Sequence, residues 1–211
     1  MTLIRYPTAG VRSARVALIA ATVVSVLPTA AVAQKIVVGK NVHVSGGHGR
    51  EAHSEVILAA DPKNAGRLLA GSHIAYGDSA GTKSIAYVSF DTGKTWTISL
   101  ERRDSSITGD PAVGYGPDGS AFFATLARWG WYRSRDGGRT WDPPTKISPA
   151  YSWDREYIAA DFTGGKYNGR VYMNSTVFPA TTGTDTSARG GSTAVALYTS
   201  LDGARHSACR S

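Results

Sequence analysis

The chain has 211 residues, a formal net charge of +7 and one cysteine, Cys209. One cysteine excludes an internal disulfide, and because the basic residues form no run, we expect no nucleic-acid partner. No apolar stretch after residue 33 is long enough to cross a bilayer, so we expect no membrane span in the mature chain.

Residues 1–33 have the pattern of a secretory signal peptide. Arg5, Arg12 and Arg15 form a basic start, and an apolar stretch follows from residue 16 to residue 27. Small residues at 31 and 33 complete a cleavage signal of the A-x-A type. We therefore expect cleavage after Ala33 and a secreted or periplasmic protein. Removing the three arginines leaves a net charge of +4 on the mature chain.

Residues 34–54 precede the repeated part of the chain, and we expect a leading strand and a glycine-rich loop there. His43, His48 and His53 are spaced five apart, and an odd spacing alternates between the faces of a strand. They could meet His73 only through a folded loop, and their spacing matches no standard zinc pattern. We expect no metal and no cofactor.

From residue 55 the chain repeats one order of short strands three times. Each unit opens with an acid and a short apolar strand, then has a turn, a second strand and a third strand. The third strand carries a tyrosine two positions before a serine, at Tyr87, Tyr132 and Tyr198. Because no helical periodicity is present, we predict an all-β domain over 34–202.

The expected units run over 55–100, 110–147 and 156–202. Glycine-, serine- and threonine-rich segments predict long loops over 72–84 and 175–193, between second and third strands. The charged residues 101–104 are expected in the connection between the first two units. Each unit would contain four strands.

The first two units share the pattern Ser-x-Asp-x-Gly-x-Thr-Trp, in copies 45 residues apart. An aspartate can accept hydrogen bonds from backbone N–H groups just ahead of it, and a glycine supplies positive φ. The pattern therefore predicts a tight hairpin turn, and we interpret both aspartates as structural anchors of that turn. The shared residues are Ser89, Asp91, Gly93, Thr95 and Trp96, then Ser134, Asp136, Gly138, Thr140 and Trp141.

A third copy of this pattern begins but is incomplete. Ser200 and Asp202 are in place, whereas Ala204, His206 and Ser207 stand where Gly, Thr and Trp are expected. The segment 203–211 has no strand pattern. We interpret it as the aberrant tail of a truncated or frame-shifted product.

The repeated turn resembles the Asp-box, or bacterial neuraminidase repeat, of sialidases and related β-propellers. The resemblance implies four-stranded blades around a channel, with about two and a half to three blades of the six or so expected. It also implies an exo-α-sialidase type of glycoside hydrolase. Such enzymes grip the sialic acid carboxylate with three arginines, and the Arg-Ile-Pro motif that usually carries the first is absent here.

The acids that open the three units are the candidate site. The first strand of each propeller blade lines the central channel, so Glu55, Asp110 and Glu156 would face one another. Arg50 and Arg155 lie just upstream of the first and third of these acids. We expect Asp110 to be catalytic and the other four to bind substrate. The alternative, in which these charges only pair with one another at strand ends, stays open.

Three functions remain open at this point. The first is an exported sialidase-like glycoside hydrolase that acts on or recognises a glycan, represented here by a fragment expected to be inactive alone. The second is a non-catalytic Asp-box propeller that binds a glycan or another extracellular ligand, because a fold alone does not define a reaction. The third is an inactive truncated gene product.

Overall fold

The computed structural model describes residues 36–75, 81–104, 109–126, 130–145, 151–179 and 194–200. The chain divides into two units, Met1–Gly39 and Lys40–Ser211. In the first unit, residues 36–39 form no regular secondary structure. The predicted signal peptide, the tail 203–211 and Asp202 of the third turn lie outside the described residues.

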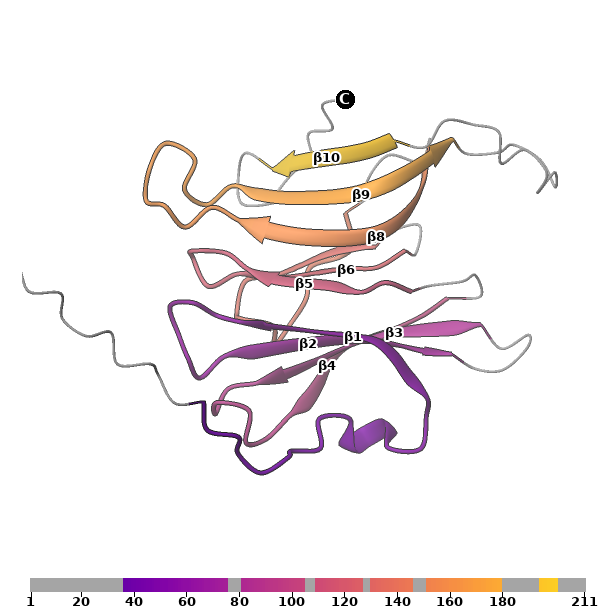
Figure 1. Ribbon diagram of the computed structural model, residues 1–211, viewed down its shortest axis with the longest axis vertical. Helices are drawn as coiled ribbons and strands as arrows, with labels where there is room; N and C mark the ends of the chain where they lie inside the picture. The colour runs from indigo at the N-terminus through magenta and orange to yellow at the C-terminus, as the bar shows by residue number, and fades with distance from the viewer. Residues whose placement is uncertain are drawn as a thin grey trace, which may run out of the picture. The chain divides into compact units, whose positions relative to one another are not determined.

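The described residues of the second unit form three antiparallel sheets and one short 3-10 helix, η1 (Gly46–His48) (Figure 1). No helix in the described part of the chain is long and apolar enough to cross a membrane. The first sheet has the order β1 (His53–Ala60), β2 (Leu68–Ala75), β3 (Thr82–Ser89) and β4 (Thr97–Asp104). The second has the order β5 (Ala112–Tyr115), β6 (Ala121–Ala124) and β7 (Trp131–Ser134). The third contains β8 (Tyr151–Ala160), β9 (Val171–Pro179) and β10 (Ala194–Ser200), with β9 in the middle.

These sheets are successive blades of an incomplete β-propeller. Within each sheet, strands that follow one another in the chain pair antiparallel, as in the meander of a blade. The first strands of the three sheets also meet, because β5 contacts both β1 and β8. The beginning of β1, the residues before β5 and the middle of β8 are thereby brought together.

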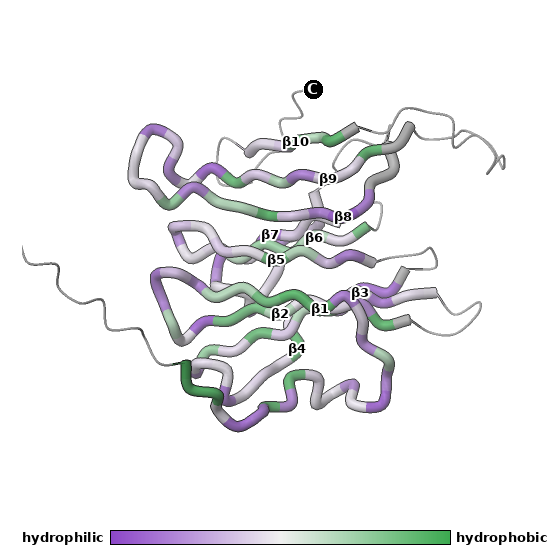
Figure 2. The backbone as a smooth tube through the Cα atoms, in the orientation of Figure 1, coloured by the Kyte–Doolittle hydropathy of each residue, from purple (hydrophilic) through white to green (hydrophobic). Residues whose placement is uncertain are grey.

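Apolar side chains fill the spaces between the sheets, and Figure 2 shows hydrophobic residues along the strands. Leu69 and Phe123 belong to a buried cluster shared by the first and second sheets. Phe122 belongs to another, shared with Val171 and Met173 of the third sheet. Because neighbouring residues of a strand point to opposite faces, β6 is buried on both sides. The second sheet is therefore the centre of the packed core.

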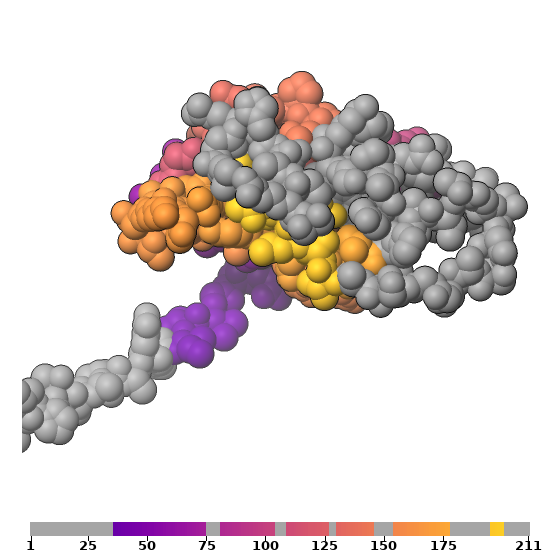
Figure 3. Space-filling view, turned by 90° about the horizontal axis from the view of Figure 1, so that it is seen from above, coloured from indigo at the N-terminus to yellow at the C-terminus, as the bar shows by residue number. Residues whose placement is uncertain are grey.

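The two outer faces of this stack differ. The segment before β1 covers the first sheet, where Val44 packs against a cluster that contains the fully buried Ile74 and Ile85. On the third sheet, Val195 and Leu197 of β10 are exposed. Figure 3 views this end of the stack, with β9 and β10 at the surface. The described residues thus cover one end face with protein and leave apolar side chains exposed on the other.

The two repeated sequences form the same hydrogen-bonded turn. In the second copy, Asp136 Oδ1 accepts a hydrogen bond from the Thr140 backbone N–H at 2.9 Å, and Oδ2 accepts one from Thr140 Oγ1 at 2.6 Å. Ser134 Oγ donates to Asp136 Oδ1 at 2.7 Å and accepts from the Gly138 N–H at 2.7 Å. The first copy repeats these contacts through Asp91, Thr95, Ser89 and Gly93.

The glycines of these turns have the expected positive φ, 82° at Gly93 and 102° at Gly138. The two tryptophans have different neighbours. Trp96 packs on the outer cluster of the first sheet, and Trp141 packs edge-on to Phe123, between the first two sheets, with ring centroids 6.3 Å apart. The turns therefore fix strand connections and supply core aromatics.

The prediction of long loops over 72–84 and 175–193 is wrong in part. Strand β2 continues to residue 75, β3 begins at 82, and β9 continues to 179. The reason is that serines in these segments are buried with hydrogen-bond partners. Ser84 Oγ lies 2.7 Å from Thr125 Oγ1, and Ser72 Oγ donates to the Ser54 carbonyl at 3.0 Å. Polar residues here extend strands and do not end them.

Three other boundaries also differ from expectation. Residues 101–104 belong to β4, where Glu101 Oε1 lies 2.7 Å from Lys83 Nζ on β3. Residues 36–52 contain η1 and turns but no strand. Strand β8 begins at 151, ahead of the expected start of the third unit at 156. The first sheet has four strands, whereas the second and third have three each among the described residues.

Candidate functional site

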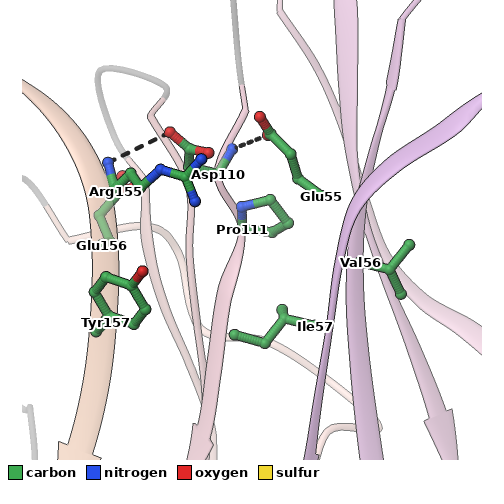
Figure 4. Close-up of a pocket in the computed structure, with 8 residues that line it drawn as sticks. All are labelled: Glu55, Val56, Ile57, Asp110, Pro111, Arg155, Glu156 and Tyr157. Atoms are coloured by element: carbon green, nitrogen blue, oxygen red, sulfur yellow. Dashed lines mark hydrogen bonds between the residues drawn. The ribbon is translucent and has the colours of Figure 1, made fainter.

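A pocket lies where the first strands of the three sheets come together (Figure 4). Its volume is about 230 Å³. Each sheet contributes residues at or just before its first strand. The lining residues are Glu55, Val56, Ile57, Asp110, Pro111, Arg155, Glu156 and Tyr157.

Each sheet places one residue at the pocket in a left-handed backbone conformation. These residues are Glu55, Asp110 and Arg155, with φ of 52°, 44° and 56°. In β1 and β8 the conformation coincides with an irregularity in strand register, between 54 and 57 and between 154 and 157. Such conformations are unfavourable for residues other than glycine and cluster at functional sites. Their threefold occurrence at one pocket marks it as a candidate site.

The same three residues are linked by hydrogen bonds from sheet to sheet. Glu55 Oε2 accepts a hydrogen bond from the Asp110 backbone N–H at 2.5 Å. Asp110 Oδ2 accepts one from the Arg155 N–H at 3.3 Å, and both are drawn in Figure 4. Arg155 is therefore the counterpart of Glu55 and Asp110. The sequence comparison gave this position to Glu156, which the structure places one residue further along β8.

Glu156 is a buried carboxyl group, only 3% exposed. Neither of its oxygens has a hydrogen-bond partner within the described residues. Burial, with smaller effects of the charges on Asp110, Asp154 and Glu55, raises the pKa of Glu156 to about 8. Glu156 therefore holds a proton at neutral pH, as a general acid must.

The neighbouring acids have different proton affinities. A hydrogen bond with Asp110 and, to a lesser degree, burial raise the pKa of Asp154. Partial burial opposes ionisation of Glu55, but the Asp110 backbone N–H and the charge of His73 lower the pKa of Glu55 overall. His73 Nδ1 lies 2.7 Å from Glu55 Oε2. The site thus combines an acid whose pKa is lowered with acids whose pKa is raised, a separation typical of acid–base sites.

Four of the five residues expected at the site lie at this pocket. Arg50 does not: it is exposed in the turn before β1 and is not among the residues that line the pocket. Sequence reasoning missed Tyr157 and the contact of His73 with Glu55. The contact with His73 has no local sequence signal, because it joins β2 to β1 across the sheet.

The other histidines in the described part of the chain do not line this pocket. His53 Nε2 is 2.7 Å from the Tyr87 hydroxyl, and His48 Nε2 is 3.2 Å from Glu101 Oε2. His43 Nε2 lies 3.2 Å from Oγ of its near neighbour Ser45. Among the described residues, no group of three or more His, Cys, Asp and Glu side chains has the geometry to hold a metal ion.

No family model and no curated protein matches the chain. Among solved structures it is similar to an α-L-arabinanase from Penicillium chrysogenum complexed with arabinobiose, at 17% identity and TM-score 0.48, over 71% of this chain and 46% of that one. A xyloglucanase from Xanthomonas campestris is 17% identical with a TM-score of 0.45, over 72% of this chain and 22% of that one. A fructofuranosidase from Schwanniomyces occidentalis complexed with fructose is 13% identical with a TM-score of 0.48, over 78% of this chain and 35% of that one.

This chain spans less than half the length of each of these three proteins. All three are named as carbohydrate-degrading enzymes, and none of the three is a sialidase. Likenesses this weak carry no inference about the activity of this chain.

Proposed function

We propose that the pocket is the site of a glycoside hydrolase that acts on a glycan outside the cytoplasm. The observation that carries the proposal is Glu156, a buried carboxyl group that keeps its proton at neutral pH because its pKa is about 8. Glycoside hydrolysis needs one protonated carboxyl group to donate to the leaving oxygen and one carboxylate to activate water or attack the sugar. The pocket offers both chemical forms.

In this proposal Glu156 donates the proton and Asp110 supplies the carboxylate. The Arg155 backbone N–H donates a hydrogen bond to Asp110 Oδ2, which holds this carboxyl group at the pocket. Asp110, expected from the sequence as the acid/base, therefore acts here as base or nucleophile. Glu55 acts through another group, because it holds the backbone N–H of Asp110.

The finer identity, an exo-α-sialidase, rests on the repeated turn at 89–96 and 134–141. No residue of either turn lines the pocket. Within the described residues, Arg155 is the only arginine that lines it, whereas sialidases grip their substrate with three. The test therefore includes a sialoside as one of several substrates and does not assume that the enzyme is a sialidase.

The test measures hydrolysis of neutral nitrophenyl glycosides and of a nitrophenyl sialoside by the full chain and its Glu156→Gln variant. We expect the variant to lose about 100- to 10,000-fold in kcat, because general acid catalysis has that magnitude. Activity of the parent should fall as pH rises past the pKa of Glu156, about 8. Asp142→Asn is the matched control, a half-buried acid outside the pocket that pairs with Arg135 at 3.0 Å.

Wild-type kcat in Glu156→Gln would refute the assignment. If the parent chain binds a glycan but cleaves none of the substrates, the non-catalytic binding module replaces the enzyme as the proposed function. That alternative uses the same pocket and needs no proton donor.

A further inference from the structure

The ionisable groups around the pocket are mostly acids. Of the described lining residues, Glu55, Asp110 and Glu156 are acids and Arg155 is the only basic one. Asp154 adds a fourth carboxyl group, hydrogen-bonded to Asp110. A ligand that enters this pocket therefore meets more carboxyl groups than cations.

The basic side chains at the pocket already have partners. A hydrogen bond with Tyr157, followed by the charges of Asp110 and, more weakly, Asp154, stabilises the charged form of Arg155 and raises its pKa. His73 lies 2.7 Å from Glu55 Oε2, and its other ring nitrogen lies 2.9 Å from Ser54 Oγ. A sugar carboxylate would have to compete with these partners, so this arrangement disfavours an anionic ligand.

Two lining side chains suit an uncharged sugar. The protonated carboxyl group of Glu156 can donate a hydrogen bond to a hydroxyl or ether oxygen. Tyr157, 55% exposed, offers an aromatic surface beside it on which the apolar face of a sugar ring can pack. In Figure 4 both side chains come from β8, next to Arg155.

We propose that the pocket selects an uncharged sugar and excludes sugars that carry a carboxylate. This inference rests on the proposed function and names its substrate class. The substrate class is a neutral glycan, whereas the resemblance of the repeated turn implies a sialoside, which carries a carboxylate.

Binding of matched sugar pairs tests the proposal without any need for turnover. The pairs are the methyl glycosides of glucose and glucuronate, galactose and galacturonate, and mannose and mannuronate. Each pair has the same ring configuration and differs only at the carboxylate. We expect, by titration calorimetry at pH 7 and low salt, that the neutral member of every pair that binds is the tighter one, by about tenfold or more.

A second measurement ties the preference to Glu156. Between pH 7 and pH 9 Glu156 ionises, in a setting that also includes Asp110, Asp154, Glu55 and Arg155. The added negative charge should increase the preference for the neutral sugar about tenfold. In Glu156→Gln the preference should stay constant over this range, since the amide does not titrate.

Three results would overturn the inference: tighter binding of a uronate in any pair at pH 7, a pH-independent preference in the parent chain, or no binding of any neutral sugar. The glycosidase proposal fails separately. If a uronate is preferred while Glu156→Gln still abolishes hydrolysis, the catalytic assignment stands and only the substrate class is wrong.

Discussion

Replacing Glu156 by glutamine should stabilise the folded protein, and more so as pH rises. Below pH 4.5, the ordinary pKa of a glutamate, both folded and unfolded chains hold the proton and the two proteins differ little. From there to about pH 8 the unfolded chain releases the proton while the folded chain keeps it. Parent stability therefore falls across this window, whereas the stability of Glu156→Gln does not.

The magnitude follows from the width of that window. Each pH unit between 4.5 and about 8 lowers the free energy of unfolding by about 1.4 kcal/mol, which gives an upper limit of about 5 kcal/mol. We expect about 2–4 kcal/mol at pH 8, because the local structure relaxes around a charged group and because nearby acids titrate together with Glu156. Urea denaturation of both proteins at pH 5, 6, 7 and 8 measures the difference.

The matched control is Glu55→Gln at the same pocket. The pKa of Glu55 is lowered, so its contribution to stability is present above pH 4.5 and is lost as pH falls below it. Glu55→Gln should therefore destabilise the protein above pH 4.5, in the direction opposite to Glu156→Gln. A pH-independent difference between the parent and Glu156→Gln would refute the reasoning, because it would mean that Glu156 titrates normally in the folded chain.

Two further predictions concern the repeated turn. Although burial opposes it, hydrogen bonds from Thr140 and Ser134 lower the pKa of Asp136 to about 2. Asp136→Ala should cost about 1–3 kcal/mol at pH 7, and the loss should shrink as pH falls from 3.8 towards 2; urea denaturation that finds an equal loss at pH 7 and pH 2 would contradict this. Gly138→Ala should lower stability by about 1–3 kcal/mol, because φ is 102° and the new Cβ would lie 3.1 Å from Val88 Cγ2. Gly46→Ala is its control, with no atom within 4 Å of the added Cβ, and thermal melts that show equal losses would exclude strain as the cause.

The sequence predicts the fold well where local chemistry repeats. The five shared residues of each turn identify its hydrogen-bond donors and acceptors, and the structure shows the expected hydrogen bonds to Asp91 and Asp136. Strand lengths are harder to predict, because Ser72 and Ser84 look like loop residues until their buried partners are known. Whether a serine ends a strand depends on what lies across the sheet.

The sequence predicts which strands meet at the candidate site, but it does not predict which residue of each strand faces the pocket. The rule that first strands line a channel brings Glu55, Asp110, Arg155 and Glu156 to one place. Which residue of each strand turns toward the pocket depends on a left-handed backbone conformation, and acids and arginines carry no sequence signal for it. Arg50, close to Glu55 in sequence, lies in the turn before β1 and outside the pocket.

The hydrogen bonds that join Glu55, Asp110 and Arg155 make the pocket a property of three sheets at once. No single blade contains a complete version of it, since each supplies one residue to a chain of contacts that crosses two sheet boundaries. The site therefore forms only when all three blades have packed together in register. A nascent chain, or one with a single blade displaced, would present dispersed acids and no pocket, so ligand binding would report the completed assembly of the three blades.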